Sequence, residues 1–234
     1  DRTVTLARKY TRKIYRQKYP GYSTQVERGI RYAKGDWVLI LDADEEVSKE
    51  LAVELKRALR RDPDVAGYEL NRRPRIFGRW IEHGGWFPDY QVRLFRKNSY
   101  LADHREVHGG FSLEGPKGRL EGCVNHYTYD NIFAYVMKMN EYTSLEVSNR
   151  LKDEPDAQAR WHHLVFNPLS HFLRMFISKK GYKDGFHGFV LALLDATYSM
   201  IRYAKLWEYR MQQREGTGVL PPITNVEIHR AKHR

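Results

Sequence analysis

The feature that most constrains this chain is an apolar run that ends in acidic residues, at positions 35–45 with the sequence GDWVLILDADE. Five successive apolar residues, entered through Gly35 and left through carboxylates, are typical of a strand buried on both faces within a parallel sheet. The flanking segments 25–34 and 50–61 have helical patterns, so the acids lie where a strand crosses over to a helix. The sequence therefore predicts an α/β fold.

The carboxylates that follow this strand are candidate metal ligands. Side-chain direction repeats every two residues in an extended chain, so Asp42 and Asp44 point to one side. The carboxyl end of a strand in an open α/β sheet borders the ligand crevice. Two oxygen ligands without neighbouring Cys or His suit Mg²⁺ or Mn²⁺ shared with a substrate diphosphate. Alternatively, Asp42 to Glu46 are a solvated turn and the acidic start of a helix capped by Ser48.

Composition and charge narrow the classes of partner. The 234 residues are 41% hydrophobic, with a net charge of +11. The single cysteine, Cys123, excludes an internal disulfide framework and fits a reducing compartment. Residues 1–35 hold ten Lys and Arg against two acids, and residues 202–234 hold seven against three. This excess favours a polyanionic partner, and without a nucleic-acid-binding motif we expect anionic lipid rather than nucleic acid.

The acidic run and two later stretches resemble one enzyme family. Residues 33–45 resemble the metal-binding strand of glycosyltransferase family 2, which are inverting enzymes of GT-A fold. Residues 83–89, HGGWFPD, and residues 91–96, QVRLFR, resemble the bacterial branch that adds sugars to the lipopolysaccharide core. The similarity extends from the first residue to about Arg210. It implies a GT-A (Rossmann-like) mixed sheet flanked by helices, a nucleotide-sugar donor, and a lipopolysaccharide-core or other lipid-linked glycan as acceptor.

The resemblance also extends to the half of the GT-A domain that binds the nucleotide. In the family, an Asp-x-Thr like residues 1–3 ends a Ser-Thr-Asp signature that follows a strand with an Asn-Glu pair. We therefore expect an amino-terminally truncated chain that lacks the strand and loop for the base. The helix after the turn at 20–23 lies near the nucleotide in the family, so Gln25 and Arg28 are candidate phosphate contacts; the alternative for Arg28 is a solvated helix face.

The segment 78–89 is expected to form the acceptor site because it is rich in glycine and aromatic residues. Gly84 and Gly85 would give the loop its flexibility, and the rings of Trp80 and Trp86 would stack on sugar faces. The alternative is that the two tryptophans fill the core.

Two residues of the same segment are candidates for the general base. An inverting transfer needs a carboxylate that takes the proton of the acceptor hydroxyl, and Asp89 is the first candidate. His83 is the second, because its unperturbed pKa lies near working pH.

The segment 103–110, DHREVHGG, supplies further candidates. In many relatives the Val-His pair is followed by Glu, whereas Gly109 stands here, and Glu106 is close enough to compensate. Arg105 and His108 are expected to contact the diphosphate or an anionic acceptor. His104 and His108 are spaced like zinc ligands, but Arg105 stands where the zinc-protease pattern needs Glu, so we predict no zinc site.

We expect a GT-A catalytic domain at 1–129, a helical region at 130–211 and a mobile tail at 212–234. His126, at the end of a strand over 119–127, either faces the diphosphate or fills the sheet edge. Asp130 is expected to cap the first helix, and Asn167-Pro168 to end the second. The last helix either lies in the membrane plane with its basic end on anionic lipid, or packs on the catalytic domain or on a second copy.

The leading hypothesis is thus an inverting, metal-dependent glycosyltransferase, peripheral on the cytoplasmic face of the bacterial plasma membrane. One alternative is a polyprenyl-phosphate glycosyltransferase, whose phosphate acceptor needs no general base. The other is a non-catalytic basic module that binds anionic polymer or membrane, with a steep dependence on salt.

Overall fold

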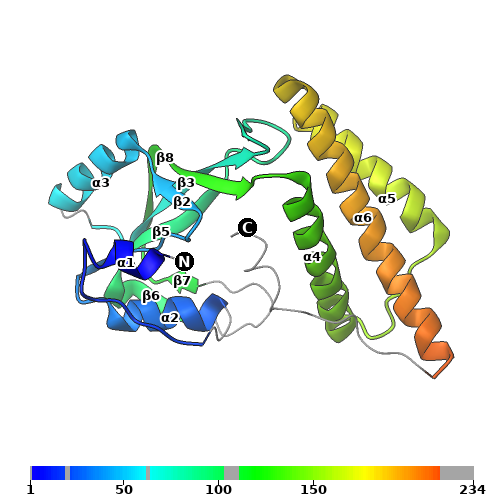
Figure 1. The fold of residues 1–234 in the computed structure, drawn as a ribbon, viewed down its shortest axis with the longest axis horizontal. Helices are drawn as coiled ribbons and strands as arrows, with labels where there is room; N and C mark the ends of the chain where they lie inside the picture. Colours follow the sequence, from blue (N-terminus) through cyan, green and yellow to red (C-terminus); the bar gives the residue numbers. More distant parts are fainter. Residues whose placement is uncertain (1, 19–21, 62–63, 103–110, 217–234) are drawn as a thin grey trace.

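The computed structural model describes residues 2–18, 22–61, 64–102 and 111–216 and joins a mixed sheet to a helical region (Figure 1). The elements of the sheet region are α1 (Thr3–Ala7), α2 (Tyr22–Tyr32), β1 (Trp37–Leu39), β2 (Glu45–Val47), α3 (Lys49–Arg61), β3 (Gly67–Ile76), β4 (Arg79–Trp80), β5 (Tyr90–Arg96), the 3-10 turn η1 (Lys97–Ser99), β6 (Tyr100–Ala102), β7 (Phe111–Leu113) and β8 (Lys117–Tyr129). The helical region consists of α4 (Ile132–Asp153), α5 (Trp161–Leu173), the π-helical turn η2 (Arg174–Ser178), the 3-10 turn η3 (Gly181–Asp184) and α6 (Gly185–Arg214).

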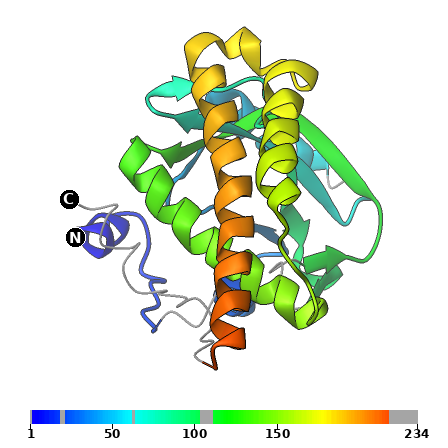
Figure 2. The same ribbon diagram turned by 90° about the vertical axis from the view of Figure 1, so that its right-hand side faces the viewer.

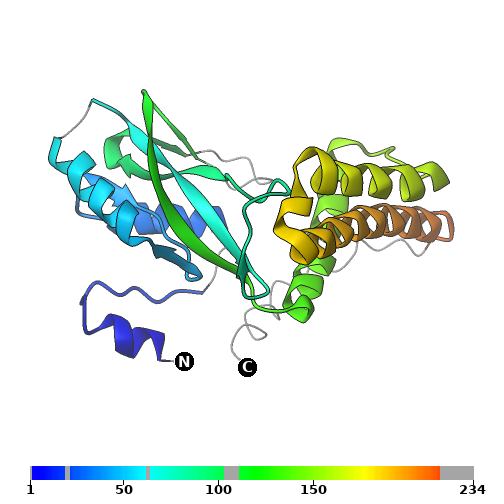
Figure 3. The ribbon, with the colours of Figure 1, turned by 90° about the horizontal axis from the view of Figure 1, so that it is seen from above.

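The sheet has the strand order β1-β5-β3-β8-β2, and β4 pairs with β3. Strands β3 and β8 are parallel, whereas the other neighbours are antiparallel. Figure 3 shows the long strands β3 and β8 side by side, running toward the helical region. This confirms the predicted α/β fold with a mixed sheet flanked by helices and followed by a helical region.

Each face of the sheet is covered by one helix of the sheet region. Successive strand residues point to opposite faces, and Leu94 and Phe95 of β5 do so. Leu94 packs in a cluster with Leu51 and Leu55 of α3, whereas Phe95 packs with Ile30 of α2. The predicted helices before and after the acidic run are thereby confirmed. Ser48 caps α3, since its Oγ accepts a hydrogen bond from the Leu51 N–H at 3.1 Å.

The prediction of a strand buried on both faces is wrong for the apolar run. Strand β1 covers three residues, pairs antiparallel with β5 and lies at the sheet edge. In the described part of the chain β5 is its only strand neighbour, and Leu39 and Leu41 are 37% and 40% exposed. An edge strand has less cover than a central one, which explains this exposure. The acids are also followed by a short strand, β2, rather than directly by a helix.

The helical region is an antiparallel pair, α5 and α6, with α4 packed on α6 (Figure 2). Asn131 caps α4 in place of the expected Asp130, because the Asn131 side chain accepts from the Ala134 N–H at 2.9 Å. The prediction that Asn167-Pro168 ends a helix is wrong, since α5 continues to Leu173. Packing along α6 offsets the backbone hydrogen bond that Pro168 cannot make. No helix among the described residues is long and apolar enough to cross a membrane.

Candidate active site

Asp42 and Asp44 lie in a partly buried ionic network that we call the acid cluster, formed by Asp42, Asp44, Glu45, Arg72, Asp89, Arg93 and His126. Arg93 of β5 donates from Nη2 to Asp42 Oδ2 at 3.1 Å and to Glu45 Oε1 at 2.9 Å. Arg72 of β3 donates from Nε to the same Glu45 oxygen at 2.6 Å. The Glu45 side chain is fully buried at 0% exposure. Two strands thus fix the acidic segment through Glu45.

Asp89 belongs to the same cluster. Arg72 Nη1 donates to Asp89 Oδ2 at 3.3 Å, and Gln91 Nε2 donates to the same oxygen at 3.2 Å. The backbone of Asp89 is fixed as well, because its N–H donates to Asn71 Oδ1 at 2.9 Å. With 40% of its side chain exposed, Asp89 remains open to a ligand. Arg72 therefore joins the predicted base to Glu45, and Arg93 joins Glu45 to Asp42.

His126 of β8 completes the cluster. One of its ring nitrogens lies 3.1 Å from Arg72 Nη2, and its Nε2 lies 3.8 Å from Asp44 Oδ2. A guanidinium has donors only, so the contact with Arg72 requires an unprotonated ring nitrogen. Strand β8 lies between β3 and β2, so His126 faces the acids from inside the sheet. Of the two interpretations left open by the sequence, filling the sheet edge does not apply.

The charges of the acid cluster favour a cation. Its four carboxylates face two guanidinium groups, which leaves an excess of two negative charges when His126 is neutral. Asp42 and Asp44 remain partly open to solvent. The described residues contain no group of three or more His, Cys, Asp or Glu that could hold a metal ion. Two oxygen donors with negative charge fit a hard divalent cation whose remaining ligands come from a substrate.

The loop around His83 joins the sheet region to the helical region. The buried Asp184 of η3 accepts from the His83 N–H at 2.8 Å and contacts the ring Nδ1 at 3.2 Å. The Gly84 N–H donates to the Lys179 carbonyl at 2.9 Å. Gly84 and Gly85 have φ of 70° and 84°, a left-handed conformation that favours glycine. The His83 ring is therefore engaged by Asp184, and the glycines build a junction.

The two tryptophans near this loop have different surroundings. Trp86 packs against the buried Ile76, Ile81 and Leu191, and it also lines a pocket between the sheet region and α4, α5 and α6. Trp80 lies on β4, with the Arg73 guanidinium 5.3 Å from its ring centroid. Trp86 thus packs in the core, which was one of the two alternatives, and it also lines a pocket, whereas stacking of its ring on a sugar stays a prediction.

The remaining candidates are placed elsewhere or not described. Arg28 Nη1 donates to Gln17 Oε1 at 2.7 Å, and Gln17 Nε2 donates to Gln25 Oε1 at 2.8 Å. Gln25 and Arg28 thus hold the segment that precedes α2. Three more candidates lie outside the described residues: Arg105, Glu106 and His108.

Arg72 and Arg93 are site residues that the sequence reasoning missed. A signal was present in β5, where Gln91 and Arg93 alternate with Val92 and Leu94. Such alternation places two polar side chains on one face of the strand, next to Asp89.

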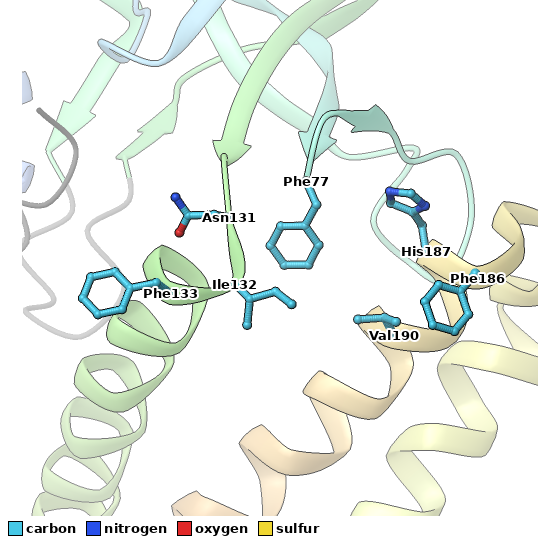
Figure 4. A pocket seen from close by; sticks show the side chains of 7 residues that line it. All are labelled: Phe77, Asn131, Ile132, Phe133, Phe186, His187 and Val190. Atoms are coloured by element: carbon cyan, nitrogen blue, oxygen red, sulfur yellow. The ribbon is translucent and has the colours of Figure 1, made fainter. Parts of the chain in front are cut away.

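An apolar pocket of about 630 Å³ opens where the two regions meet. Figure 4 shows side chains from three elements around it: Phe77 after β3, Ile132 at the start of α4, and Phe186 and Val190 of α6. Phe186 is 76% exposed, so the pocket is continuous with an exposed apolar surface.

The architecture of the acid cluster and the sequence similarity to known proteins indicate the same class of enzyme. An α/β sheet whose apolar strand leads into an Asp-x-Asp, with a further carboxylate in the same cluster, has the features of a sugar-transferring enzyme. Residues 1–112 match the model of the glycosyl transferase family 2. Taken with the relatives described next, this match shows that the chain is a glycosyltransferase whose residues 1–112 are similar to that family.

The relatives carry the same type of name. The lipopolysaccharide core biosynthesis glycosyltransferase LpsC of Rhizobium meliloti (strain 1021) is 26% identical over 194 residues, which cover 82% of this chain and 71% of the relative. An uncharacterized glycosyltransferase of Rickettsia bellii is 25% identical over 237 residues, covering 93% of this chain and 77% of the relative. The uncharacterized glycosyltransferase RT0209 of Rickettsia typhi is 26% identical over 227 residues, covering 92% and 76%.

Proposed function

We propose that this chain is an inverting, metal-dependent glycosyltransferase that moves a sugar from a nucleotide-sugar donor to a lipopolysaccharide-core or other lipid-linked glycan. The observation that carries the proposal is the convergence of Asp42 and Asp44 with Asp89 in one cluster. The acceptor class is supported by LpsC, whose name assigns it to lipopolysaccharide core biosynthesis.

The donor side of the reaction rests on Asp42 and Asp44. These carboxylates would hold Mg²⁺ or Mn²⁺ together with the diphosphate of the donor, and the ion would supply positive charge that neutralises the departing diphosphate. Arg93 and Glu45 fix the loop for this task, because Arg93 bonds Asp42 and the Asp42 N–H donates to Glu45 Oε2 at 3.0 Å. Four predicted contacts to the donor remain proposals: Gln25, Arg28, Arg105 and His108.

The acceptor side rests on Asp89. Its carboxylate would take the proton of the acceptor hydroxyl while the oxygen attacks the anomeric carbon. Arg72 and Gln91 orient this carboxylate. Because Arg72 also bonds the buried Glu45, the base is held at a fixed position relative to the donor-binding acids. His83 and Glu106 remain secondary candidates for the base.

A lipid-linked acceptor implies work at a membrane surface, and we place the enzyme on the inner face of the plasma membrane as a peripheral protein. Helix α5 exposes Trp161, Phe166 and Leu169, which are 71%, 58% and 52% exposed. The segment 157–183 contains five Lys and Arg and no acidic residue. Exposed apolar side chains bordered by cations suit an anionic lipid surface. The pocket of Figure 4, lined by residues of α4 and α6 and by Phe77, has the apolar lining that a hydrocarbon chain requires.

Thermal unfolding with a panel of nucleoside diphosphates tests the donor site. At a nucleotide concentration about 100-fold above Kd, binding adds roughly 2.7 kcal/mol. For a chain of this size, that stabilisation corresponds to a rise in Tm of about 5–10 °C. The rise should require Mn²⁺ and should vanish in Asp42→Asn/Asp44→Asn. A rise that is unchanged in the double variant would refute the assignment.

The variant Asp89→Asn distinguishes a role of Asp89 as general base from a role in nucleotide binding. It also distinguishes a hydroxyl acceptor from a phosphate acceptor. The variant should keep the nucleotide-dependent rise in Tm and lose transfer to a lipopolysaccharide-core acceptor, because the amide cannot take a proton. A polyprenyl-phosphate acceptor needs no general base, so transfer that survives in Asp89→Asn would favour that alternative.

A further inference from the structure

A second pocket, of about 310 Å³, lies between the sheet region and the helices α4, α5 and α6. We call it the aromatic pocket, because five rings line it: Trp86, Tyr129, Tyr135, Tyr142 and Tyr198. Its volume is at the lower end of small-molecule sites, which span about 300–1,000 Å³. A pocket of this size suits a compact ligand rather than a whole nucleotide sugar.

The charged groups of the aromatic pocket neutralise one another. Arg202 Nη1 donates to Glu146 Oε2 at 2.9 Å, and Tyr198 Oη donates to Glu146 Oε1 at 2.6 Å. His171 Nδ1 lies 2.9 Å from Asp195 Oδ2. Each cationic or imidazole group is therefore matched by a carboxylate. An anionic ligand would meet two carboxylates there, so this lining favours an uncharged polar ligand.

Hydrogen-bonding groups at the same wall point to a hydroxyl-bearing ligand. Burial raises the pKa of Tyr129 and Tyr135, so their protonated hydroxyls can both donate and accept, whereas Tyr198 donates its proton to Glu146 and can only accept.

The aromatic pocket adjoins the acid cluster. Tyr129 ends β8 three residues after His126, and the charge of Asp44 is near enough to contribute to the raised pKa of Tyr129. Trp86 stands three residues before Asp89 in the same loop. The aromatic pocket and the proposed base are thus joined by the short stretch from Trp86 to Asp89, and Tyr129 lies within range of the Asp44 charge.

We propose that the aromatic pocket binds an uncharged sugar unit of the acceptor glycan. This inference rests on the proposed function, since it assigns the position of the acceptor relative to Asp89. Rings for the apolar faces of a sugar, together with paired polar groups for its hydroxyls, are the combination that carbohydrate recognition uses. A phosphorylated sugar unit is disfavoured by the carboxylates of Glu146 and Asp195.

Saturation-transfer NMR on the full chain tests the site. The probes are methyl glycosides of neutral hexoses and of a heptose, with glucose 6-phosphate as the charged comparison. We expect at least one neutral glycoside to bind and glucose 6-phosphate to bind more weakly than it does. In Tyr142→Ala, which changes a partly exposed ring of α4, the affinity should fall about tenfold. Tyr182→Ala is the matched control, because Tyr182 is 49% exposed against 45% for Tyr142 and lies outside the pocket lining.

Three results would overturn the inference: no neutral glycoside binds, glucose 6-phosphate binds at least as tightly, or Tyr142→Ala and Tyr182→Ala have equal affinities. The nucleotide panel with Mn²⁺ keeps this test separate from the proposed function. Glycoside binding without any nucleotide effect would support the pocket and count against the donor site. A nucleotide-dependent rise in Tm without glycoside binding would support the donor site and count against the pocket.

Discussion

Replacing Glu45 by Gln should destabilise the fold by an amount that the structure allows us to work out. The Glu45 carboxylate is fully buried and accepts from three donors: Arg72 Nε at 2.6 Å, Arg93 Nη2 at 2.9 Å and the Asp42 N–H at 3.0 Å. Glutamine keeps the size of the side chain but removes its charge. Two guanidinium groups with 14% and 5% exposure then lose their shared counter-charge.

The expected loss follows from the partners that remain. Removing one member of a buried ion pair costs about 3–5 kcal/mol. Arg93 keeps Asp42 and Arg72 keeps Asp89, so we expect the lower end, about 3 kcal/mol. At about 2–4 °C for each kcal/mol, Tm should fall by roughly 6–12 °C.

Urea unfolding followed by circular dichroism measures the effect, with Glu82→Gln as the control. Glu82 pairs with Arg73 at the surface, where the side chains are 50% and 36% exposed. An exposed pair of this kind contributes less than about 1 kcal/mol. If Glu45→Gln lost no more stability than Glu82→Gln, the acid cluster would not hold the acidic segment as we describe.

The junction between the two regions provides further predictions. Gly188→Ala should destabilise by about 1–3 kcal/mol in urea unfolding, because a Cβ there would lie 1.8 Å from the Gly181 carbonyl oxygen. Gly29→Ala should instead stabilise by about 0.5–1 kcal/mol, since its Cβ would meet nothing within 4 Å in helix α2; equal signs would contradict the packing at Gly188. Asp184→Asn should cost about 1.5–3 kcal/mol because the buried carboxylate accepts two backbone N–H groups, whereas the exposed Asp153→Asn should change urea stability by less than about 0.5 kcal/mol.

Much of this arrangement was predictable because it is encoded locally. The helices α2 and α3 follow from hydrophobic periodicity and from Ser48, and β8 was expected over 119–127 from the family resemblance. Asp42 and Asp44 were recognisable because they end an apolar run. Asp89 was recognisable from the resemblance of the stretch 83–89 to a known branch of enzymes. The structure places these three aspartates in one cluster.

The predictions that proved wrong, and the contacts that were missed, depend on residues far apart in the sequence. An apolar run looks alike at the centre and at the edge of a sheet, so Trp37 to Leu41 did not reveal that β1 pairs on one side with β5. Arg72 is 27 residues from Glu45, and His83 is 101 residues from Asp184, and no local pattern predicts such pairs. Pro168 was read as a helix end, but the packing of α5 on α6 overrides that local preference.

The stretch 83–89 connects the acid cluster with the helical region, although its two glycines would suggest a flexible loop. Gly84 is hydrogen-bonded to Lys179, and His83 is held by Asp184, so one end of the stretch is anchored to η2 and η3. Trp86 then forms a wall of the aromatic pocket, and Asp89 enters the acid cluster through Arg72. A shift of this anchor would move the pocket wall and the base together. In the proposed function, the helical region would therefore set the distance between an acceptor and Asp42 and Asp44, which the sheet alone cannot fix.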